Sequence, residues 1–307
     1  MGPMRRWLIF LLGTLAAGAL LAPWAYIGAQ WSAARWPALA AVAAHPFRRY
    51  VDRCLLAGVV IGFWWGRRWL DGGTPARWGW RETARPGGRL GFGLVLGLAG
   101  TGLLGLALVA GGGRVFQAPG NAGAWGRLGL AAGGSALAVA VLEETVFRGF
   151  LFGSVRRAHD WPAAAVFSSL IYAAAHFVTR AAESGPVDWL AGGRLLVRSF
   201  GGLLGGTEGW WPEFLLLAGA GLVLALARER SGGLWLPAGL HAGWVLGLKL
   251  SHGLTRAPAG DAAGWKALLG AGMLLASGWV LRRSFPARTV TERALVVADE
   301  SSSQELA

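Results

Sequence analysis

The sequence contains a single cysteine, Cys54, among its 307 residues. One thiol excludes an intramolecular disulfide and any metal site built from several cysteines. Charged residues are also scarce, at 15% of the chain, whereas 54% of the residues are hydrophobic. This much apolar surface exceeds what one water-soluble core can hide. The composition therefore predicts an integral membrane protein.

Eight long apolar segments are separated by short polar stretches. Each approaches the ~20 residues that an α-helix needs to cross a bilayer. Backbone groups in hydrocarbon must be hydrogen-bonded within the segment, and uninterrupted runs favour helices over the alternating strands of a barrel. We expect an all-α fold, a polytopic transmembrane bundle of about eight helices, at residues 7–29, 54–70, 90–110, 128–152, 163–177, 214–227, 234–250 and 265–281.

The predicted segments form one membrane domain over residues 1–285. Residues 286–307 lose hydrophobicity, include a run of three serines, and are expected to form a disordered tail. Residues 1–6 and the apolar run after them also resemble a cleavable signal peptide, but the run is long enough to remain in the membrane. Arginines beside the segments favour a multi-pass cell-membrane protein with both termini in the cytoplasm.

The formal net charge of +13 raises the question of an anionic partner. The arginines lie in short loops beside the apolar segments rather than on one soluble module, so their distribution fits membrane topology better than nucleic-acid recognition. We therefore expect membrane lipid as a partner and no nucleic acid.

Three ionisable residues, Glu143, Glu144 and Arg148, interrupt the apolar stretch at 139–152. A charge inside a membrane segment is costly unless it is paired or faces a polar cavity, so such residues indicate a functional site. Glu144 and Arg148 are four residues apart with the acid first, which is the favourable order for an ion pair on one helical face. That pair leaves Glu143 as the carboxylate available for general-base chemistry.

Two later apolar segments carry histidines. Tyr172 and His176 are four residues apart and share one helical face, and His241 lies inside another segment. Taken singly, each histidine fits an interhelical hydrogen bond, and the carboxylates with Arg148 fit a buried ion-pair cluster that fixes packing. Their joint occurrence on three apolar helices favours a catalytic site instead.

The carboxylates and the arginine resemble the first motif of the CPBP family of intramembrane proteases, also called the CAAX-protease/bacteriocin-processing or ABI family. This family includes the type II CAAX prenyl endopeptidases. Its Glu-Glu-x-x-x-Arg motif is similar to Glu143, Glu144 and Arg148. The motif alone occurs on many solvated helices, but here it lies within a membrane segment and two histidines follow it.

The histidines resemble the second and third motifs of the same family, in the same order. Its Phe-x-x-x-His motif is similar to Tyr172 and His176, with tyrosine in place of phenylalanine. Its His-x-x-x-Asn motif is similar to His241, with Val245 where the asparagine would stand. Valine has no donor, so the amide's part in stabilising an oxyanion is missing. The resemblance covers about residues 139–248.

The resemblance implies a mechanism and a role for each residue. Glu143 would activate water for attack on a peptide carbonyl, His176 would position that water or shuttle its proton, and His241 would stabilise the oxyanion. Glu144 and Arg148 would hold the helix and tune the site. No cofactor is expected, but zinc stays an open alternative, because two histidines and a carboxylate form a known catalytic zinc set.

We therefore predict an intramembrane endopeptidase that acts on a peptide or membrane-protein substrate near the membrane surface. A proton-coupled transporter that uses the same acids and histidines as a relay is one alternative. A catalytically silent relative that binds a membrane partner is the other, and Val245 makes it more credible. Prenylated CAAX processing, bacteriocin or peptide maturation, self-immunity and signalling-protein cleavage are all substrate classes that the resemblance allows.

Overall fold

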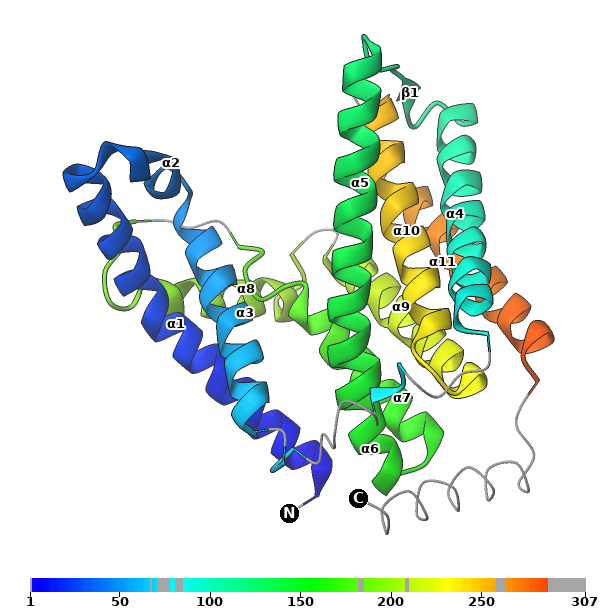
Figure 1. Cartoon of the computed structure of the whole chain (residues 1–307), viewed down its shortest axis with the longest axis horizontal. Helices are drawn as coiled ribbons and strands as arrows, with labels where there is room; N and C mark the ends of the chain where they lie inside the picture. Colours follow the sequence, from blue (N-terminus) through cyan, green and yellow to red (C-terminus); the bar gives the residue numbers. More distant parts are fainter. Residues whose placement is uncertain are drawn as a thin grey trace. The chain divides into compact units, whose positions relative to one another are not determined.

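The computed structural model describes residues 2–66, 68–70, 78–80, 85–181, 185–207, 210–257 and 263–286. These residues are almost all helical, as Figure 1 shows, which confirms the predicted all-α fold. The elements are α1 (Pro3–Arg35), η1 (Pro37–Leu39), α2 (Ala40–Ala43), α3 (Phe47–Gly66), α4 (Pro86–Ala110), β1 (Val115–Phe116), α5 (Ala122–Glu143), η3 (Glu144–Phe152), α6 (Gly153–Ala158), α7 (Trp161–Ala175), α8 (Ala191–Leu204), α9 (Trp210–Ser231), α10 (Trp235–Leu254), β2 (Thr255–Arg256) and α11 (Ala263–Ser284).

All eight predicted apolar segments coincide with helices. Among the described residues, four helices have the length and apolarity needed to cross a membrane, namely Pro3–Arg35, Pro86–Ala110, Ala122–Ala158 and Trp210–Ser231. A fifth apolar helix, Trp161–Ala175, is shorter. The helical membrane bundle is thus confirmed, whereas the number of eight crossings stays a prediction. The predicted tail lies outside the described residues apart from Pro286.

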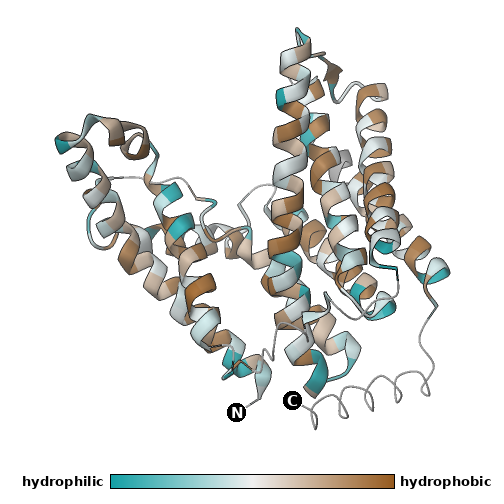
Figure 2. Cartoon of the chain, in the orientation of Figure 1, coloured by the Kyte–Doolittle hydropathy of each residue, from teal (hydrophilic) through white to brown (hydrophobic). Residues whose placement is uncertain are grey.

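Large apolar side chains cover the outer surfaces of the helices. On α4, Leu103 and Leu106 are each 68% exposed, and Leu130 on α5 is 81% exposed. Figure 2 shows hydrophobic residues along the length of both helices rather than at one end. In water such a surface would drive aggregation, whereas lipid tails solvate it at no cost. The chain is therefore a membrane protein.

The described chain forms two compact units. The first contains α1 to α3 and residues 142–222, and the second contains α4, residues 122–141 of α5, residues 223–231 of α9, α10 and residues 269–284 of α11. The predicted single domain over residues 1–285 stays a prediction.

In the first unit, α1 packs along α3, as Figure 1 shows. A Cβ added at Gly18 would lie 2.4 Å from Leu55 Cδ2, so the small residue permits the close approach. The lower end of α1 is fixed by Trp7, whose indole Nε1 donates a 2.6 Å hydrogen bond to the Ser154 hydroxyl on α6. This bond ties the start of the chain to the helix that follows η3.

A second helix, α8, also packs on α1. A Cβ at Gly192 would lie 2.2 Å from the Ala19 carbonyl oxygen, so the two backbones are nearly in contact. The start of α8 is fixed by Asp188, which accepts the Leu190 amide and two bonds from Arg194, at 2.7 and 3.0 Å. The hydrogen bond from Arg194 holds the pKa of Asp188 below its usual value. The sequence analysis did not predict this helix.

In the second unit, α4 and α10 pack along their whole length (Figure 1). Cβ atoms added at Gly93 and Gly97 would lie 2.5 Å from the carbonyl oxygens of Leu236 and Leu240, respectively. Further along, Thr101 Oγ1 occupies the space beside Gly247. The contacts advance in the same direction on both helices, so α4 and α10 are parallel, and glycines separated by three residues permit the contact.

Polar contacts connect the two ends of this parallel pair to its neighbours. At the start of α4, Arg89 donates to the Ser231 carbonyl, and nearby Arg230 donates to the Phe285 carbonyl at 3.0 Å. At the other end, β1 and β2 pair antiparallel, with Val115 opposite Arg256. The N-terminal ends of α4 and α10 therefore lie at the same end of the second unit as the C-terminal ends of α9 and α11. The predicted membrane topology requires this arrangement. Which end faces the cytoplasm stays a prediction.

Candidate active site

The helix geometry changes at the predicted catalytic carboxylate. The α-helix α5 ends at Glu143, and the next nine residues, Glu144–Phe152, form the π-helix η3 before α6 resumes the α-helical form. π-helical turns are rare in proteins, and those that occur often lie at functional sites. Glu143 and Glu144 therefore stand at the point where one helical form passes into the other.

The predicted ion pair between Glu144 and Arg148 is confirmed. Arg148 Nη1 lies 3.2 Å from Glu144 Oε1, and the side chains are 1% and 0% exposed, respectively. Arg148 also donates through Nη2 to the Gly221 carbonyl on α9 at 3.4 Å, and its guanidinium carbon lies 4.4 Å from the centre of the Tyr172 ring. This arginine thus joins η3 to both α7 and α9.

Tyr172 is a buried residue that packs against η3. It is 4% exposed and meets the Phe147 ring edge-on, with the ring centres 5.2 Å apart. One turn earlier on α7, Ser169 contacts α9 so closely that a Cβ at Gly221 would lie 2.7 Å from Ser169 Cβ. The close approach brings the Gly221 carbonyl within reach of Arg148.

His176 lies at the first residue after α7 and is exposed. Its ring centre is 4.8 Å from that of Tyr172, so the predicted pairing of the two rings is confirmed. His176 Nδ1 lies 2.9 Å from the Tyr172 carbonyl oxygen, which can only accept a hydrogen bond. Nδ1 therefore carries the proton, and Nε2 of the neutral ring has a lone pair available for a water or a substrate hydrogen.

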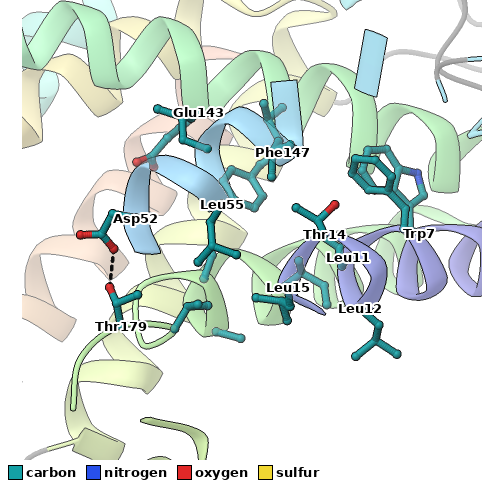
Figure 3. Close-up of a pocket in the computed structure, with 18 of the residues that line it drawn as sticks. Trp7, Leu11, Leu12, Thr14, Leu15, Asp52, Leu55, Glu143, Phe147 and Thr179 are labelled. Carbon is teal, nitrogen blue, oxygen red and sulfur yellow. Dashed lines mark hydrogen bonds between the residues drawn. The ribbon is translucent and has the colours of Figure 1, made fainter. Parts of the chain in front are cut away.

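Glu143 is half-buried and lines a cavity of about 420 Å³ within the first unit. Figure 3 shows this cavity with residues of α1 and α3 facing η3. Its walls are largely apolar, with residues such as Leu11, Leu55 and Phe147. Glu144, Arg148 and His176 are not among the described residues that line it. In the first unit, Glu143 therefore lies at the cavity wall, whereas Glu144 and Arg148 form a buried ion pair that does not line the cavity.

Two polar residues of this cavity were missed by the sequence analysis. Asp52 on α3 lines it, as does Thr179 after α7, and the Thr179 hydroxyl donates to Asp52 Oδ1 (Figure 3). The one available signal was the position of Asp52, which is the last acid before the apolar segment at 54–70. No motif marks it, so its place beside Glu143 depends on tertiary structure.

Two tryptophans between α3 and α4 also contact η3. Trp80 Nε1 donates to Thr145 Oγ1 at 3.1 Å, and Trp78 packs edge-on against Phe150 with ring centres 4.3 Å apart. The structure places them against the π-helix that carries Glu144.

His241 lies in the second unit, on α10, and is 4% exposed. Gly239 and Gly243 form the face of α10 that packs against α4, and residues two positions away point to the other side of a helix. His241 and Val245 share that other face, since they are four residues apart. The apolar segment that contains His241 is helical and the side chain is buried, while its catalytic role stays a prediction.

The described residues of either unit contain no group of three His, Cys, Asp or Glu side chains that could hold a metal ion. The zinc alternative is therefore left to experiment.

Residues 126–247 match the family model described as type II CAAX prenyl endopeptidase, Rce1-like. The resemblance to the CAAX protease family is thus confirmed over this segment. The match begins in α5 and ends in α10, so it includes Glu143 and both histidines, while α1 and α3 lie outside it. No protein of curated function and no solved structure matches the chain. The match to this family supports a membrane-embedded protease.

Proposed function

We propose that this chain is an intramembrane endopeptidase in which Glu143 activates the attacking water. One observation carries the proposal. Glu143 lies at the wall of a cavity of about 420 Å³, whereas the adjacent Glu144 is buried in an ion pair with Arg148. A carboxylate that borders a largely apolar cavity can accept a proton from water there, and a carboxylate held by an arginine cannot do so as readily.

In the proposed reaction, Glu143 takes a proton from water as the water oxygen bonds to the peptide carbonyl carbon. The carbonyl electron pair moves onto oxygen and forms the oxyanion. When the oxyanion collapses, the C–N bond breaks and Glu143 returns its proton to the leaving nitrogen, so that one water is added across the peptide bond. His176 Nε2 accepts a hydrogen bond from the water and orients it, since the Tyr172 carbonyl fixes the ring.

His241 is proposed to donate to the oxyanion. Such a donor is typically worth about 3–4 kcal/mol of transition-state stabilisation. Val245 occupies the position of the family's asparagine, so this chain has one donor fewer at that step. We propose a correspondingly slower reaction rather than a silent protein, because Glu143, Arg148, His176 and His241 all retain the residue types of the motifs.

The proposed substrate is a peptide or a membrane protein cut near the membrane surface, with membrane lipid as the surrounding partner. A prenylated CAAX peptide is one member of this class, as the name of the matched family indicates. On the basis of the arginine distribution, we place the protein in the cell membrane with both termini in the cytoplasm.

Cleavage of a membrane-peptide library by the purified, detergent-solubilised protein tests the proposal. Wild-type protein should release products, and Glu143→Gln should lose nearly all of this activity while retaining its melting temperature. The matched control is Glu213→Gln, the same chemical change at a carboxylate that is 47% exposed and paired with Arg180. Equal activity in wild type and Glu143→Gln would refute the assignment of the base.

A strong zinc chelator decides between the two forms of the reaction. Activity that survives the chelator supports the glutamate–water mechanism, whereas activity that is lost and then recovered with added zinc would move Glu143 and the histidines into a metal site. Product release itself distinguishes a protease from both a transporter and a silent relative.

A further inference from the structure

We infer that Asp52 determines specificity in the cavity that Glu143 borders, by selecting substrates with a lysine or arginine beside an apolar segment. This inference rests on the proposed function, because it concerns the substrate of the same site. Asp52 lies on α3, outside the segment that matches the CAAX protease family. Its role is therefore a property of this chain that the family motifs do not assign.

The charge of the cavity lining has one sign. Among the 21 described residues that line it, only Asp52 and Glu143 are ionisable, and both are acidic. No arginine, lysine or histidine is among those 21 residues. In the view of Figure 3, Asp52 and Glu143 lie toward one end of the cavity, and Trp7 and Leu12 lie toward the other. A ligand with an apolar body and a cationic group matches this lining.

Asp52 keeps its charge available for a ligand. Within the part of the chain that the structure describes, its side chain has one hydrogen-bond partner, the Thr179 hydroxyl, which donates to Oδ1. A hydroxyl leaves the negative charge in place. The arginine that follows Thr179, Arg180, forms a salt bridge with Glu213 instead. The second oxygen of Asp52 can thus accept a hydrogen bond from a cationic substrate group.

The same lining disfavours an anionic group. A glutamate or aspartate of the substrate beside Asp52 would meet a charge of its own sign, and this repulsion is moderate because the Asp52 side chain is exposed. Basic residues commonly flank apolar segments at the membrane surface, where such a substrate would enter. The substrate feature that this cavity recognises is therefore a basic residue next to an apolar stretch.

Two substitutions separate the charge of Asp52 from its hydrogen bond. Asp52→Asn keeps an oxygen that accepts the Thr179 hydroxyl but removes the charge, and Thr179→Val removes the hydroxyl but keeps the charge. The assay uses the membrane-peptide library in sets of three, in which one position beside the apolar segment is lysine, glutamine or glutamate. The measured quantity is the ratio of kcat/KM for the lysine peptide to that for the glutamine peptide.

Wild type and Thr179→Val should both prefer lysine by about fivefold, the upper range for a partly exposed ion pair. In Asp52→Asn this ratio should fall to about one, and in Asp52→Lys the glutamate peptide should become the best of the three. A ratio near one in wild type, or a preference that survives Asp52→Asn, would overturn the inference and leave the proposed protease intact. Wild-type protein that cleaves no peptide would overturn both.

Discussion

The buried pair between Glu144 and Arg148 allows a quantitative prediction of stability. The charged atoms are 3.2 Å apart, and neither side chain is more than 1% exposed. At an effective dielectric constant of 20, Coulomb's law gives an attraction of about 5 kcal/mol at this distance. Removal of one partner from a buried pair typically costs about 3–5 kcal/mol, since the other charge is left without compensation. We expect Arg148→Met to lower the free energy of unfolding by about 3–4 kcal/mol.

Removal of both partners should cost much less than the sum of the two single changes. Replacement of a buried pair by apolar side chains of similar volume is often close to neutral. The double variant Glu144→Leu/Arg148→Met still loses the donor to the Gly221 carbonyl and the cation over the Tyr172 ring, so about 1–2 kcal/mol should remain lost. The difference between the double variant and the single variants measures the coupling of the pair.

The assay is reversible unfolding in mixed micelles with increasing SDS, followed by the fluorescence of the 18 tryptophans. Arg194→Met is the matched control, because Arg194 pairs with Asp188 at an exposed position and its loss should shift the midpoint far less. If Arg148→Met shifts the midpoint no more than Arg194→Met, or if the single effects simply add in the double variant, the pair does not hold η3 in place.

Three further outcomes follow from the same structure. Val245→Asn should raise kcat/KM by about threefold or more without a change in melting temperature, because it restores a donor one turn from His241; no gain in rate would show that the amide is not used here. Gly97→Val should destabilise the protein by about 1–3 kcal/mol, because its side chain would overlap the α10 backbone, whereas Gly102→Val on the same helix has open space and should be tolerated. In a Cys54→Ser background, the thiol introduced by Gly120→Cys should react with a membrane-impermeant maleimide in intact cells, and protection of that thiol would reverse the predicted orientation.

Hydrophobicity predicted the helices because a segment that crosses a bilayer must be both apolar and helical. Each of the eight apolar segments coincides with a helix, since backbone groups in lipid have no other partner than their own segment. The sequence analysis missed α8, which is interrupted by Gly192 and Gly193 and carries two arginines, so it lacks a long apolar run. Its helical form depends on contacts with α1, which are set by the tertiary fold, and on the local hydrogen bonds from Leu190 and Arg194 to Asp188.

The site was predictable to the extent that spacing fixes geometry. Residues four apart on a helix are neighbours, so the Glu144–Arg148 and Tyr172–His176 contacts were expected and are present. Asp52 was not expected to accompany Glu143, since 90 positions of sequence separate them and no periodicity connects one helix to another. Contacts of this kind come from the packing of helices, which a single sequence does not specify.

The π-helix at Glu144–Phe152 explains why the motif carries more information than its spacing alone. An apolar run looks the same whether its backbone bonds connect residues four or five apart, so hydropathy cannot reveal the change of form. Arg148 reaches Glu144, the Gly221 carbonyl and the Tyr172 ring together, and these three contacts lie on different elements. The π-helix therefore carries the buried pair, while Glu143, the last residue of α5, lies at the cavity wall.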